Sequence, residues 1–123
     1  MRRSLFAFGI AGIVLALAGT GTSATAKDKF QLKGEVYGNS AFKIEMKNAA
    51  GRPLKTVKRG TYRIKIEDKA TIHNFRLKGP GVNKSTSVSR RAETIWTVRL
   101  RPGKYTYLCD PHASMMRGSF RVT

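Results

Sequence analysis

The sequence has 123 residues, with 24 Lys or Arg and 7 Asp or Glu, so its formal charge at pH 7 is +17. This length allows one domain and excludes two large ones. The positive excess favours acidic partners, anionic lipid or cell-wall polymers. Nucleic acid would also suit the charge, but the export signal described next argues against that partner.

The first 26 residues have the order of an export signal. Two arginines follow the initiator, residues 5–18 are apolar, and Ala-Thr-Ala at residues 24–26 is a small-residue cleavage site. The apolar run is short for a membrane span. We therefore predict a signal peptide over residues 1–26 and an exported, periplasmic or extracellular domain over 27–123, without stable membrane insertion. An uncleaved anchor and a twin-arginine signal are the alternatives.

Cys109 is the only cysteine in the chain. An exported domain of this size would often be stabilised by disulfides, but a lone cysteine cannot form an internal one. The remaining explanations are an intermolecular bridge, a free thiol or a metal ligand.

From residue 30 onward, apolar and polar residues alternate with a period of two, which is typical of strands with one buried face. Turn signals rich in Gly and Pro separate the runs. The pattern predicts an all-β domain, an antiparallel sandwich or barrel of seven to nine short strands. The apolar residues of the four clearest runs are Phe42, Ile44 and Met46; Tyr62, Ile64 and Ile66; Trp96, Val98 and Leu100; Phe120 and Val122.

Many Lys and Arg residues occupy the outward positions of this alternation. A solvated sheet surface explains them. A patch for an acidic partner is the second interpretation, and the two are compatible.

The residues with metal chemistry lie in two distant segments. Cys109 and His112 are three positions apart around Pro111, which stiffens the turn. His73 shares a strand face with Phe75, where a neutral imidazole needs a partner for its nitrogen. A metal ion would supply that partner.

The softness of these donors favours copper. One thiolate, two imidazoles and a weak axial thioether form the trigonal set of electron-transfer copper sites, whereas zinc rarely gains from a thioether. Met46 is in phase with a strand core, so Met115 and Met116 compete for the axial place, and spacing alone does not decide between them.

Three motifs resemble those of the cupredoxins, the small blue copper proteins: His73-Asn74-Phe75, the run at residues 105–112, and Met116-Arg117-Gly118. The resemblance covers most of residues 30–123. It implies a Greek-key β-sandwich of about eight strands with one type 1 copper ion at one end. It implies His73, Cys109 and His112 as equatorial ligands and Met116 as the axial ligand.

The resemblance also assigns roles around the ligands. Asn74 would tie the two ligand loops together by hydrogen bonds. Asp110 stands where a neutral residue is common, and its carboxylate should favour Cu(II) and lower the reduction potential. Phe75, Trp96, Tyr105 and Tyr107 are interpreted as core packing.

We therefore expect a monomeric electron carrier, not an enzyme, that exchanges single electrons with redox proteins bearing acidic docking surfaces. One alternative is copper binding and delivery without redox turnover. Another is a basic surface-adhesion module. An enzymatic alternative, a hydrolase with Cys109 as nucleophile, lacks a visible oxyanion loop in the sequence.

Overall fold

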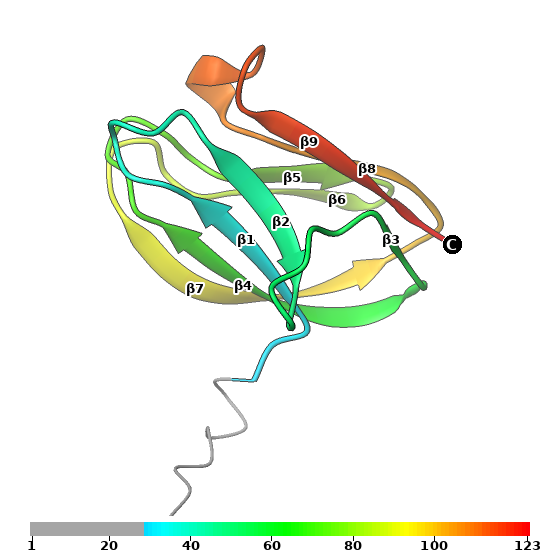
Figure 1. Ribbon diagram of the computed structural model, residues 1–123. Coiled ribbons are helices and arrows are strands. Elements are labelled where there is room, and N and C mark those ends of the chain that lie inside the picture. The colour runs from blue at the N-terminus through cyan, green and yellow to red at the C-terminus, as the bar shows by residue number, and fades with distance from the viewer. Residues whose placement is uncertain (1–28) are drawn as a thin grey trace, which may run out of the picture.

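The computed structural model describes residues 29–123, which form two β-sheets packed face to face (Figure 1). The first sheet has the order β2-β1-β4-β7 and consists of β1 (Leu32–Val36), β2 (Ile44–Asn48), β4 (Gly60–Asp68) and β7 (Ala92–Leu100). The second has the order β3-β9-β8-β5-β6 and consists of β3 (Thr56–Val57), β5 (Arg76–Gly79), β6 (Val82–Ser85), β8 (Gly103–Leu108) and β9 (Arg117–Val122). The predicted signal peptide, residues 1–26, lies outside the described part.

The predicted β-sandwich is confirmed, with one difference in detail. The described residues form nine strands, within the expected seven to nine and one more than the eight that the resemblance implied, because β3 is a separate two-residue strand. The sheets are mixed: β1 pairs with β4 and β3 pairs with β9 in parallel, while the other pairs are antiparallel. After β2 the chain crosses to the second sheet, where it forms β3. It then returns to the first sheet as β4, which lies beside β1 and runs in the same direction. No helix within residues 29–123 is long and apolar enough to cross a membrane.

The core lies between the sheets and takes the inward side chains of both. Ile64 and Ile66 from β4 are fully buried, as is Tyr105 from β8. The Tyr105 hydroxyl donates to the Pro80 carbonyl (2.8 Å) and accepts from the Arg101 N–H (2.9 Å), so this buried phenol has no unpaired polar atom. Its ring covers Gly79, where an added Cβ would collide with the ring atoms. The core therefore fixes β5 against β8, the two strands that lead to the ligand segments.

One predicted core residue is wrong. Phe42 was expected to share the buried face of a strand with Ile44 and Met46, but β2 begins only at Ile44 and Phe42 is 51% exposed. Met46 is buried, as predicted. The alternation of apolar and polar residues extends into the loop before β2, although that loop is not part of the strand. The loop places the Phe42 ring at the end of the sandwich, against His73 and His112.

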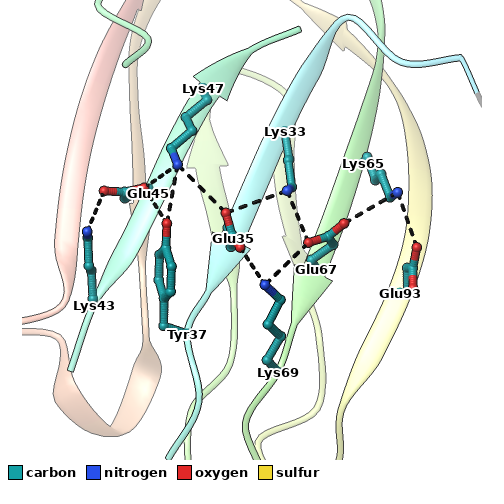
Figure 2. Close-up of polar contacts among 10 residues, drawn as sticks. All are labelled: Lys33, Glu35, Tyr37, Lys43, Glu45, Lys47, Lys65, Glu67, Lys69 and Glu93. Carbon is teal, nitrogen blue, oxygen red and sulfur yellow. Dashed lines mark hydrogen bonds and ion pairs between the residues drawn. The ribbon is translucent and has the colours of Figure 1, made fainter. Parts of the chain in front are cut away.

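The outer face of the first sheet carries ordered rows of charge, which we call the Lys/Glu network (Figure 2). Glu45, Glu35, Glu67 and Glu93 lie opposite one another across the four strands. Like charges directly opposite each other destabilise a sheet, but lysines on both sides of the row bring ammonium groups within 2.7–3.8 Å of these carboxylates. These lysines are Lys33, Lys43, Lys47, Lys65 and Lys69. The network therefore neutralises most of its own charge.

The network predicts a loss of stability in acid. The hydrogen bond from Lys47 is the main reason that the pKa of Glu45 falls from 4.5 to about 2. Burial alone would raise the pKa of Glu35 and of Glu67, but their lysine contacts outweigh it and both pKa values are lowered. Because the folded pKa lies below the unfolded one, the stabilisation is complete above pH 4.5 and disappears as the pH falls toward about 2.

Urea denaturation as a function of pH measures this loss. In Glu45→Gln, the free energy of unfolding should be lower at neutral pH and should fall less steeply between pH 4.5 and about 2. An unchanged slope in that variant would show that the network contributes nothing to acid sensitivity.

Candidate metal centre

Three metal-binding side chains from two segments converge at one end of the sandwich. His73 precedes β5, Cys109 follows β8, and His112 ends the short 3₁₀ helix η2 (Asp110–His112) in the turn that leads to β9. The two Nδ1 atoms of the histidines are 3.0 Å apart. The Cys109 Sγ lies 3.8 Å from the Nδ1 of His73 and 3.6 Å from that of His112. The structure thus brings together three of the four residues that the sequence nominated as ligands, in a cluster that could hold a metal ion.

The dimensions of this triangle fit a bound ion. An ion equidistant from the three donors would lie about 2 Å from each, the length of metal–imidazole and metal–thiolate bonds. Two imidazole nitrogens and a sulfur at these separations can each offer a lone pair to one central ion. A cation there would satisfy all three, whereas a shared proton could serve only two.

The three donors differ in burial. His73 and Cys109 are fully buried, while His112 is partly exposed. Burial, with the neighbouring His112 as the second cause, lowers the pKa of His73. The Nε2 of His73 is buried and has no hydrogen-bond partner of good geometry among the described residues. The Asn39 backbone lies near enough to act against the lowering of the His73 pKa, but it is the smallest of the causes. His73 is therefore a neutral imidazole that can act as a metal ligand.

Backbone hydrogen bonds close the turn that holds Cys109 and His112. The Cys109 N–H donates to the Met116 carbonyl (3.0 Å), and the Met116 N–H donates to the His112 carbonyl (2.8 Å). Pro111 lies in the first turn of η2, where its missing N–H is harmless. The same turn separates the two candidate axial residues, since Met116 is 1% exposed and Met115 is 64% exposed. Met116 alone of the pair packs in the buried cluster that contains Cys109.

Asn74 joins the two ligand segments, as the sequence suggested. Its Nδ2 donates to the Asp110 carboxylate (2.7 Å), and its Oδ1 accepts the Asp110 backbone N–H (2.7 Å). Asn74 is itself buried, and the Thr86 hydroxyl accepts the N–H of the next residue, Phe75 (2.8 Å). The residues that follow His73 and Cys109 are therefore locked to each other before any metal binds.

Arg76 is a contributor that the sequence reasoning missed. Its Nε and Nη2 donate to the two carboxylate oxygens of Asp110 at 2.7 and 2.9 Å. This contact is the main reason that the pKa of Asp110 is lowered. Strand alternation showed only that Arg76 points outward. Its register beside Leu108, which brings it to Asp110, depends on the pairing of β5 with β8.

Phe42 is the second contributor that was missed. Its ring meets those of His73 and His112 edge-on, with centroid separations of 5.1 and 5.0 Å. Asn39 fixes the loop that carries Phe42, because its amide donates to the Thr71 hydroxyl (2.8 Å) and accepts the Thr71 N–H (2.7 Å). Phe42 thus shields both imidazoles from water on one side. No periodic signal in the sequence distinguishes this role from core packing.

A buried thiol with two imidazoles and a nearby thioether defines a copper site of the electron-transfer kind. The sequence matches the family described as "Copper binding proteins, plastocyanin/azurin family" over residues 44–123. The chain belongs to this family of copper-binding, electron-transfer proteins, and the His73–Cys109–His112 cluster fits its type 1 copper site.

Comparison with rusticyanin supports the fold. Reduced rusticyanin is 21% identical, with a TM-score of 0.55, over 75% of this chain and 77% of that one. Auracyanin from Roseiflexus castenholzii is 15% identical, with a TM-score of 0.49, over 74% of this chain and 94% of that one. No curated protein sequence matches the chain.

The Arg76–Asp110 pair changes the expected influence of Asp110 on bound copper. The carboxylate was expected to lower the reduction potential, but the guanidinium beside it offsets that charge. Asp110→Asn should raise the potential and Arg76→Met should lower it, each by roughly tens of millivolts.

The double variant is the matched control for this prediction. It should return close to the wild-type potential in cyclic voltammetry, because both charges are gone. A double variant that deviates as far as either single variant would show that the two charges do not compensate.

Proposed function

We propose that this chain is an exported carrier of single electrons that holds one copper ion through His73, Cys109, His112 and Met116. The convergence of two imidazoles and a thiol within a triangle of 3.0–3.8 Å carries the proposal. Bound copper would supply a Cu(II)/Cu(I) couple. Cys109 would bind as a thiolate, and the buried Met116 would be the weak axial ligand.

The rigidity of the ligand segments suits this task. The Asn74–Asp110 hydrogen bonds and the closed turn from Cys109 to Met116 hold the donors in one arrangement. Ligands that move little require little reorganisation when the charge of the ion changes. The same rigidity favours electron transfer over copper delivery, in which the ligands must open.

His112 would offer the route for the electron. It is the one partly exposed member of the cluster, whereas His73 and Cys109 are buried. The large exposed apolar side chains among residues 29–123 lie beside the histidines: Ile72 and Met115 are on the ligand segments, and the ring of Phe42 packs against both imidazoles. An apolar rim around an exposed histidine edge allows a partner to approach closely and expel water.

Export and partners complete the proposal. The signal-like residues 1–26 support an exported domain over 27–123, in the periplasm or outside the cell. The partners would be redox proteins with acidic docking surfaces, because the chain is strongly basic. We infer a monomeric carrier and not an enzyme, since the donor set uses the only thiol and both histidines of the chain.

The optical spectrum with Cu(II) tests the site. The purified protein should bind one copper and show a strong blue thiolate-to-copper band, which Cys109→Ala should abolish completely. Met115→Leu, with its substitution at an exposed position of the same turn, should retain the band. Absence of the band in the wild-type protein would contradict the type 1 site.

The axial assignment predicts different effects for the two adjacent methionines. Met116→Leu should raise the reduction potential, because it removes a weak donor that favours Cu(II), while the blue band persists. Met115→Leu should change the potential far less, because its side chain is exposed. Equal potentials in wild type and Met116→Leu, measured by voltammetry, would exclude Met116 as the axial ligand.

A further inference from the structure

The two outer faces of the sandwich differ in how their charges are compensated. On the first sheet, the lysines of the Lys/Glu network contact carboxylates (Figure 2). On the second sheet, register places Lys104 beside Arg121. Lys78 pairs with Thr106, two residues along β8 from Lys104 toward the metal centre. Arg117, the first residue of β9, pairs with Leu108 at the end nearest the metal centre. We call these four exposed residues, Lys78, Lys104, Arg117 and Arg121, the basic face.

No Asp or Glu side chain among residues 29–123 compensates the basic face. Four of the six acidic residues in this range belong to the Lys/Glu network. Asp68 is buried and accepts hydrogen bonds from the Thr86 hydroxyl and the Ala70 N–H. Asp110 is held by Arg76 and Asn74. The lysines of the Lys/Glu network are therefore paired with glutamates, whereas the cations of the basic face have no acidic side chain against them.

The basic face starts at the metal centre and runs away from it along β8 and β9. Arg117 directly follows Met116, and its register partner Leu108 directly precedes Cys109. Leu108 and Lys104 are four residues apart on β8, which corresponds to roughly 13 Å of extended strand. This exceeds the Debye length of about 8 Å at physiological ionic strength. A partner must therefore lie along the sheet to use all of these charges.

The chemistry of the basic face suits an acidic protein surface better than a membrane. Uncharged Thr106 and Ser119 lie between its cations, and register places them opposite each other. At its far end, Lys55 joins Lys104 and Arg121 around a depression of about 330 Å³ that could accept a carboxylate. The face has none of the large exposed apolar side chains that insert into lipid, since those described, Phe42, Ile72 and Met115, lie on the loops around the metal centre.

We propose that the outer face of sheet β3-β9-β8-β5-β6 is the docking surface for an acidic protein, and that the Lys/Glu network takes no part. Identifying this protein as a redox partner rests on the proposed function. The docking itself rests on the distribution of charge.

The experiment uses poly-L-glutamate as the acidic polypeptide and the copper-loaded protein in its reduced form. Amide NMR shifts during titration should cluster on β5, β8 and β9 and spare β1, β2 and β4. Lys104→Glu/Arg121→Glu should weaken binding by about tenfold or more at low salt. The control Lys29→Glu/Arg52→Glu makes the same change in net charge at exposed positions off the basic face, and should weaken binding by about twofold or less.

Three results would overturn the proposal. Equal weakening by both double variants would show that net charge alone drives binding. Shifts centred on the Lys/Glu network would place the surface on the other sheet. Binding of phosphatidylglycerol vesicles through the basic face, without binding of poly-L-glutamate, would identify lipid as the occupant.

Two further measurements keep the test decisive. Lys104→Gln/Arg121→Gln is a milder variant that should show the same direction of effect if charge reversal prevents folding. The blue band is recorded on every variant. A protein with the band but without localised shifts would refute the docking surface alone, whereas localised shifts without the band would refute the copper site alone.

Discussion

The two reciprocal hydrogen bonds between the Asn74 amide and Asp110 are the interaction on which the rest of the site depends. Each residue directly follows a ligand candidate, so the bonds fix His73 and Cys109 relative to each other across two distant segments. The buried position of Asn74 protects these bonds from competition with water. Arg76 holds the other side of the same carboxylate, and the arrangement therefore exists before any ion is bound.

Around this fixed cluster, the molecule separates three physical tasks. Burial keeps the His73 ring neutral and the thiol away from solvent. The partly exposed His112, with Phe42 against its ring, would be the contact point for a partner in the proposed function. The sheets divide the charge, since one neutralises its lysines with glutamates and the other leaves its cations available. Substitutions in the charged faces, around His112 or in the buried cluster should then each affect one of these three tasks without the other two.

The sequence predicted the features that depend on local pattern. Period-two alternation identified the β class, and the spacing of Cys109, His112 and His73 led to the residues that converge. The choice of Met116 over Met115 came from the family motif, and the burial of Met116 agrees with it. Each of these signals lies within one strand, one turn or one short motif, so it can be recognised from the sequence alone.

The features that depend on pairing between strands could not be predicted. Arg76 reaches Asp110 only through the register of β5 with β8, and the glutamate row exists only because β1 lies between β2 and β4. Phe42 was misplaced because alternation gives no warning of where a strand begins. The separation of charge between the sheets likewise depends on which strands share a sheet, which outward positions alone do not specify.

A crystal structure of the copper-loaded protein, with anomalous scattering recorded at the copper edge, tests the central claim most directly. The account predicts one anomalous peak among the Nδ1 of His73, the Sγ of Cys109 and the Nδ1 of His112, with these side chains and the Asn74–Asp110 hydrogen bonds placed as described above. A peak elsewhere, or a His73 ring turned away from the sulfur in the presence of the ion, would contradict it.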